Sequence, residues 1–124
     1  MCKALLSIKP EFVDKIFNGE KKYEYRKNIF KNNINVIIIY ETSPTKKIVG
    51  EATIEEIIFD NVDSVWEKTK EVSGVTNDFF ISYYKGREMA VAYKLGEITP
   101  YDIPQELADL GVSQAPQSYI YIYD

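Results

Sequence analysis

A short segment near the N-terminus gathers the residue types best suited to chemistry. The segment Gly19–Arg26 has the spacing Gly-x-Lys-x-x-Glu-x-Arg. If residues 23–27 are extended, Glu24 and Arg26 leave the same face of the strand, roughly 6–7 Å apart. With Lys21 in the preceding turn, the three charges would form a polar cluster able to hold a ligand that has both donors and acceptors. The alternative is a surface ion pair on a solvated strand, which contributes about 0–1 kcal/mol.

Lys21 has three roles open to it. As a catalytic nucleophile or base it needs its pKa lowered from about 10.4, by burial or by a neighbouring cation such as Arg26 or Lys9. As a binding residue it needs only its charge, which suits a phosphate or a base carbonyl. It can also be one of fifteen solvated basic residues. A carboxylate at Glu24 stabilises the ammonium form, so binding is favoured over catalysis.

Other polar residues are candidates for the same cluster. The planar fork of Arg26 suits a phosphate or a carboxylate, and Glu24 can accept a hydrogen bond from an exocyclic amine such as that of cytosine. The chain also has ten tyrosines, which can stack on bases or simply pack in strands. The remaining candidates for ligand binding lie at expected strand ends or in strands: Lys9, Tyr40, Ser43, Gln117 and Ser118.

Composition excludes several classes of site and protein. The chain of 124 residues is expected to be one domain, 1–124, and its single cysteine, Cys2, excludes an internal disulfide. The absence of histidine removes Ser-His-Asp and Cys-His nucleophile pairs and every zinc site that needs imidazole. No acidic segment has the ligand spacing of a metal loop, so no metal or cofactor is expected. No apolar run is long enough to span a bilayer, and we expect a cytoplasmic protein.

Charge is divided unevenly along the chain. Residues 1–50 contain ten basic and five acidic residues, a balance of +5, whereas residues 51–124 contain five basic and fourteen acidic residues, a balance of −9. The net charge of −4 argues weakly against nucleic acid as a partner. The basic N-terminal part can nevertheless form a face that attracts phosphate on an acidic protein.

Hydrophobic periodicity predicts strands dispersed among short helices. This pattern favours an α+β fold, a small mixed β-barrel of five to six strands with short helices covering its ends, closed by pairing of its two terminal strands. Helices are expected at Pro10–Asn18, from Asn61 or Asp63 to about Glu71, and at Asn77–Tyr84, with a helical turn within the Pro100–Gly111 connection. Strands are expected at Lys3–Lys9, Tyr23–Lys27, Asn35–Tyr40, Lys47–Phe59, Met89–Thr99 and Gln117–Tyr123.

Five blocks of sequence, in order, resemble the ASCH domain, a family of PUA-like β-barrels. They run from the first expected strand to the last, so the resemblance covers essentially the whole chain. The blocks are Leu5–Pro10, Gly19–Arg26, Tyr40–Pro44, Ile48–Glu51 and Pro116–Tyr119.

The resemblance implies a cleft beside the barrel, lined by the motif residues, and a role in RNA binding or in coactivator complexes. One subgroup consists of amidohydrolases that cleave N4-acetylcytidine with a lysine at the position of Lys21. Those members carry threonine where this chain has Glu24, and their catalytic acid falls in a helical region near Glu67 and Glu71.

Three functions therefore remain open. The first is a module that binds RNA or a nucleotide-like small molecule, with a modified base held in a cleft around Lys9, Lys21, Glu24 and Arg26. The second is an amidohydrolase of modified nucleosides with Lys21 as its catalytic residue. The third is a protein-interaction module that uses an exposed aromatic surface at Phe79–Tyr84. The sequence does not set the oligomeric state.

Overall fold

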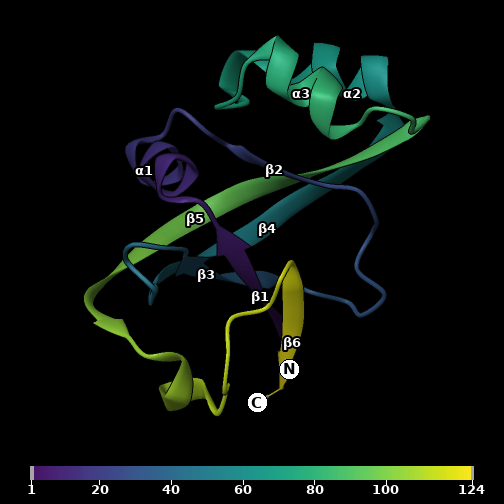
Figure 1. Cartoon of the computed structure of the whole chain (residues 1–124). Coiled ribbons are helices and arrows are strands. Elements are labelled where there is room, and N and C mark those ends of the chain that lie inside the picture. Colours follow the sequence, from purple (N-terminus) through teal and green to yellow (C-terminus); the bar gives the residue numbers. More distant parts are fainter. Residues whose placement is uncertain (1, 124) are drawn as a thin grey trace.

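The computed structural model describes residues 2–123, which form one mixed six-stranded sheet with helices packed against it (Figure 1). The strand order is β2-β5-β4-β3-β1-β6. The strands are β1 (Cys2–Ile8), β2 (Tyr23–Arg26), β3 (Val36–Glu41), β4 (Lys47–Asn61), β5 (Met89–Gln105) and β6 (Tyr119–Tyr123). The helices are α1 (Pro10–Asn18), α2 (Val62–Thr69) and α3 (Asn77–Tyr83), with 3-10 turns at Lys70–Val72 and Leu107–Leu110.

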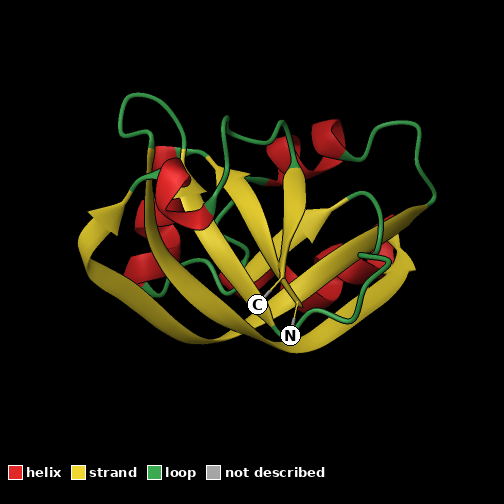
Figure 2. Cartoon of the chain, turned by 90° about the horizontal axis from the view of Figure 1, so that it is seen from below, coloured by secondary structure: helices red, strands yellow, loops and turns green. Residues whose placement is uncertain are grey.

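The expected α+β architecture with six strands is confirmed. β1 runs parallel to β3, and the other neighbouring strands are antiparallel. The expected pairing of the first and last strands is present, with Leu5 opposite Ile120. The sheet curves strongly (Figure 2) but does not close, because its edge strands β2 and β6 are not paired in residues 2–123. A side-chain hydrogen bond spans that gap, from Arg26 Nη1 to Ser118 Oγ at 3.0 Å.

The fifth strand is longer than its sequence pattern predicts. We expected an irregular connection from Pro100, but β5 continues to Gln105, with Pro100 opposite Gly50 of β4. This part of β5 tolerates proline because β2 pairs only with residues 91–94, which leaves the other side of β5 free. Gly50 lies at a shift of the β4–β5 register, and a Cβ there would lie 2.7 Å from the Thr99 carbonyl oxygen.

Local signals place the helices as predicted. α1 begins at Pro10, whose missing N–H costs nothing at that position, and ends at Gly19, which has the left-handed φ of 88°. Of the two residues considered as the cap of α2, Asn61 caps it, and Thr76 caps α3. No helix in residues 2–123 has the length and hydropathy needed to cross a bilayer.

Helices α2 and α3 pack over one end of the sheet, next to β2 (Figure 1). Their apolar faces meet the strands in a buried cluster that includes Val65, Phe80 and Tyr84. A larger core lies under α1, and its side chains come mainly from β1, β3 and β5. The space between α1, β2 and α3 is where the motif residues gather.

Candidate functional site

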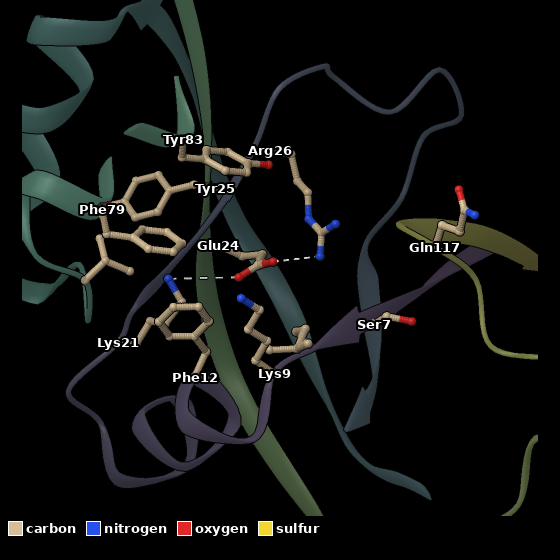
Figure 3. A pocket seen from close by; sticks show the side chains of 12 residues that line it. Ser7, Lys9, Phe12, Lys21, Glu24, Tyr25, Arg26, Phe79, Tyr83 and Gln117 are labelled. Atoms are coloured by element: carbon tan, nitrogen blue, oxygen red, sulfur yellow. Dashed lines mark hydrogen bonds and ion pairs between the residues drawn. The ribbon is translucent and has the colours of Figure 1, made fainter. Parts of the chain in front are cut away.

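A cleft of about 370 Å³ opens between α1, β2 and α3 (Figure 3). This volume is within the range of small-molecule sites in proteins. Polar residues of the motif and aromatic side chains of the two helices share its wall. The lining residues are Ser7, Ile8, Lys9, Phe12, Lys21, Glu24, Tyr25, Arg26, Val75, Phe79, Tyr83 and Gln117.

Lys21 lies at the base of the cleft and is only 3% exposed. Its ammonium donates a hydrogen bond to the Ser73 carbonyl oxygen at 3.1 Å and lies 3.9 Å from Glu24 Oε1. The same nitrogen lies 4.8 Å from the centre of the Tyr25 ring and 5.4 Å from that of Phe12. The lysine is thus held between a carbonyl, a carboxylate and two aromatic faces.

Burial lowers the pKa of Lys21 below its ordinary value of 10.5. The carboxylate of Glu24 raises it, as expected from the sequence, while the cations of Arg26 and Lys15 lower it further. Desolvation is the largest of these effects, so the net direction is opposite to that of the Glu24 effect alone. The spacing of the motif did not reveal this burial.

Glu24 and Arg26 form a short ion pair on the neighbouring wall. Arg26 Nη2 donates to Glu24 Oε2 at 2.8 Å, and Arg26 Nη1 donates to Ser118 Oγ at 3.0 Å. The third guanidinium nitrogen, Nε, is buried and has no hydrogen-bond partner among residues 2–123. A buried charged donor without a partner is costly.

Aromatic rings form the opposite wall. The Phe79 and Tyr83 rings are nearly parallel, with an interplanar angle of 7° and centroids 6.2 Å apart, and Phe12 meets Phe79 edge-on at 5.2 Å. The Tyr25 hydroxyl donates to Thr69 Oγ1 at 2.7 Å, and burial raises the pKa of Tyr25 to about 12. Tyr25 is therefore neutral at ordinary pH and fixed in place.

The structure brings most of the predicted binding residues together. Lys9, Lys21, Glu24, Arg26 and Gln117 line the cleft. Ser118 does not line it but hydrogen-bonds Arg26, which does.

Four other candidates lie elsewhere. Tyr40 is buried in a separate cluster with Leu5, Ile38 and Ile48, and Ser43 is exposed in the turn after β3. Neither residue lines the cleft. The two glutamates considered as a catalytic acid, Glu67 and Glu71, are exposed and also lie outside the lining, and Glu67 pairs with Lys70.

Sequence reasoning missed part of the lining. Ser7 faces the cleft from the end of β1, and its hydroxyl donates to the Pro116 carbonyl oxygen at 2.6 Å, which fixes the segment before β6. Phe12 fits a buried helix face by periodicity, and Val75 lies in the connection between α2 and α3. Ser7 belongs to the Leu5–Pro10 block but was not chosen as a candidate, and no motif marks Phe12 or Val75. Phe79 and Tyr83 fit a protein-binding surface by sequence, but they complete the cleft instead.

The cleft thus offers cationic donors, one carboxylate acceptor and flat apolar faces. That combination suits an anionic ligand with a planar ring. No group of three or more His, Cys, Asp or Glu side chains able to hold a metal ion occurs in residues 2–123.

A family model, a sequence relative and solved structures point to one family. The family model for the ASCH domain matches residues 6–101. The ASCH domain-containing ribonuclease of Zymomonas mobilis is 29% identical over 124 residues, which cover 97% of this chain and 84% of that protein. The crystal structure of ASCH from Zymomonas mobilis superposes with a TM-score of 0.88 at 29% identity, covering 98% of this chain and 88% of that one.

A second relative is larger. The large ribosomal subunit protein uL22 of Ureaplasma parvum serovar 3 is 27% identical over 119 residues, 95% of this chain. The chain spans only 38% of the length of that protein.

Proposed function

This chain belongs to the ASCH domain family, and on that basis we propose that its cleft binds single-stranded RNA, taking one nucleotide with its base against the aromatic wall. The observation that carries the proposal is the gathering of three cations, Lys9, Lys21 and Arg26, in the same cleft as the Phe79 and Tyr83 rings. A phosphate would pair with these cations. The ribonuclease named among the relatives supports RNA as the ligand class.

The two walls of the cleft suit different parts of a nucleotide. Cations on one side suit a phosphate, and rings such as Phe79 and Tyr83 on the other suit a base, because base–aromatic stacking tolerates any sequence. Glu24 adds an acceptor that would favour a base with an exocyclic amine, including a modified one. Binding that depends on phosphates should weaken as salt rises.

Fluorescence anisotropy with a labelled single-stranded RNA over a range of salt concentrations tests this proposal. We expect Lys21→Ala and Arg26→Ala each to weaken binding and to reduce the salt slope, by about 0.7 for each lost phosphate contact. Lys68→Ala is the matched control, because Lys68 is exposed, pairs with Asp60 and lies outside the cleft. Binding that ignores salt and survives both cleft substitutions would refute the proposal.

A second candidate function is hydrolysis at the same site, favoured by the lowered pKa of Lys21. A neutral Lys21 amine could take the proton of an RNA 2′-hydroxyl while the 2′-oxygen attacks the adjacent phosphorus. The 5′-oxygen of the next nucleotide then leaves and takes a proton from water. Alternatively, the same amine could take a proton from a water whose oxygen adds to the acetyl carbonyl of N4-acetylcytidine. The resulting ammonium would return that proton to N4 as the C–N bond breaks, which releases cytidine and acetic acid.

Product analysis separates these reactions. A cyclic 2′,3′-phosphate end would indicate RNA cleavage, and cytidine released from N4-acetylcytidine would indicate amide hydrolysis. We expect either activity to be lost in Lys21→Ala. Absence of both products at high protein concentration would leave the cleft as a binding site only.

The third function, a protein-interaction surface at Phe79–Tyr84, has less support. That reading required exposed aromatic residues without a polar cleft, whereas Phe79 and Tyr83 form the wall of one.

A further inference from the structure

A second hollow, of about 440 Å³, lies on the side of the molecule where β4, β5 and the loop after β2 meet. Its floor is apolar and accessible: Phe59 is 52% exposed, Ile29 42% and Met89 38%. Phe59 lies opposite Val91 in the β4–β5 ladder, and it points to the face of β4 opposite its neighbour Ile58, which packs against the helices. An exposed aromatic ring in a hollow needs an explanation, because nothing in residues 2–123 covers it.

The rim of this hollow is mainly cationic. Lys27, Arg87 and Glu88 line it together with Asn28. Arg87 Nη1 donates to the Lys27 carbonyl oxygen at 3.2 Å and to Asn28 Oδ1 at 3.4 Å, which holds the guanidinium at the rim. Two cations against one carboxylate give the hollow a positive balance in a protein whose net charge is −4.

Lys27 lines the hollow and also lies next to the wall of the cleft. Lys27 follows Arg26 in the chain, and its ammonium lies 5.0 Å from the centre of the Tyr83 ring, which is part of the cleft wall. Figure 3 shows Tyr83 and Arg26 close together at one edge of the cleft. The three cations are thus neighbours: Arg26 precedes Lys27 in the chain, and Arg87 hydrogen-bonds the Lys27 carbonyl oxygen.

We propose that this hollow, formed by Lys27, Ile29, Phe59, Arg87 and Met89, is a second nucleotide subsite that holds the nucleotide flanking the one in the cleft. The inference rests on the proposed RNA-binding function and extends it: the ligand is a single strand at least two nucleotides long. Lys27 and Arg87 contact the connecting phosphates, and the base of the flanking nucleotide stacks on Phe59.

Charge and shape favour a nucleic acid strand over other occupants. A cationic groove with an exposed ring along it is the arrangement by which proteins bind single strands without sequence preference. A second copy of this chain would have to present a complementary acidic surface while filling the same hollow with an apolar side chain. Self-association is therefore one outcome of the test below.

Titration of a short and a long ligand tests the subsite. The short ligand is uridine 3′,5′-bisphosphate, which fills the cleft alone, and the long ligand is hexauridylate. We expect Phe59→Ala to weaken hexauridylate binding about tenfold and to leave the bisphosphate affinity unchanged. Phe59→Trp should restore the hexauridylate affinity because it keeps a stacking face. Ile103→Ala is the control for loss of an exposed apolar side chain, since Ile103 is 80% exposed and lies outside the hollow.

A second variant tests the subsite with substitutions that should not disturb the fold. Lys27→Ala combined with Arg87→Ala changes only exposed side chains and should reduce the salt slope by about 1.4 for hexauridylate, but by no more than about 0.7 for the bisphosphate, which carries only the phosphate that joins the two nucleotides. Thermal unfolding of each variant shows whether the fold is kept.

The outcomes separate the two proposals. Equal hexauridylate affinity in wild type, Phe59→Ala and the double variant would overturn the subsite and leave the cleft in place. Failure of wild type to bind either ligand would overturn both. A concentration-dependent dimer that Phe59→Ala abolishes, with RNA affinity unchanged, would overturn the subsite and identify the hollow as a contact between copies.

Discussion

At the scale of residues, the charge balance of the cleft depends on one carboxylate. Glu24 lies 2.8 Å from Arg26 Nη2 and 3.9 Å from Lys21 Nζ, and it is only 7% exposed. Because it is the only acidic residue that lines the cleft in the described part of the chain, the two cations would repel each other without it. Glu24 therefore both orients Arg26 and makes a buried Lys21 tolerable.

We expect Glu24→Gln to lower the free energy of unfolding by roughly 3 kcal/mol, because it leaves two cations without their counter-charge in a desolvated site. Urea unfolding measures the change. Glu67→Gln is the matched control, since it removes a carboxylate from an exposed pair with Lys70 and should change stability little. Equal effects of the two substitutions would show that the cleft pair is effectively solvated.

At the scale of elements, the connection between α2 and α3 covers Lys21. Ser73 accepts its hydrogen bond, and Gly74 lies directly against its methylene groups. Gly74 has a φ of 70°, and a Cβ at this position would lie 2.4 Å from Lys21 Cβ. This connection therefore requires glycine for two reasons, the backbone conformation and the space that the lysine fills.

Gly74→Ala should therefore displace Lys21 and weaken RNA binding as well as stability. Gly86→Ala separates the two causes: Gly86 has a φ of 81° but open space around it, so alanine there should cost only the backbone strain of about 1–2 kcal/mol. Unfolding and RNA titration of both variants provide the measurement. Loss of RNA affinity in Gly86→Ala as well would argue that the effect is not specific to Lys21.

The helix that supports this connection begins with a side-chain cap. Asn61 Oδ1 accepts a hydrogen bond from the Ser64 N–H at 2.8 Å. We expect Asn61→Ala to lower the free energy of unfolding by about 1 kcal/mol. Asn77→Ala should cost less, within about 0.5 kcal/mol, because Asn77 is exposed at the start of α3 and Thr76 is the cap there. Chemical unfolding of the two variants side by side checks the difference.

At the scale of the whole molecule, the buried lysine should make stability depend on pH. The pKa of Lys21 is lowered in the folded protein, so between that pKa and its unfolded value of 10.5 the unfolded state binds more protons. Stability contributed by this group therefore rises with pH through that window. Tyrosines with raised pKa values, such as Tyr25, act in the opposite direction from about pH 10 upwards.

Comparison of wild type with Lys21→Met isolates the lysine. We expect the free energy of unfolding of the wild type, relative to that of Lys21→Met, to increase as pH rises toward 10.5. The reason is that Lys21 has a charge to desolvate below this pH, whereas methionine has none at any pH. Urea unfolding at a series of pH values measures it. A difference independent of pH would mean that Lys21 keeps an ordinary pKa.

Much of the fold follows from local sequence signals. The β-branched run of β3 predicted a strand, and Pro10 and Gly19 marked both ends of α1 because each acts on the backbone of its own position. The C-terminal end of β5 could not be predicted from local signals. Its two prolines suggest a loop, and only the absence of a partner strand on one side permits them.

The sequence by itself determined which charged residues could act together: the spacing of Glu24 and Arg26 on one strand face is a property of the strand. The tertiary structure decided that Lys21 is buried, that Tyr40 and Ser43 lie away from the cleft, and that Ser7, Phe12 and Phe79 complete it. The physical reason is that burial and the meeting of three elements depend on contacts between residues far apart in the chain, such as Lys21 with Ser73, which no local pattern encodes.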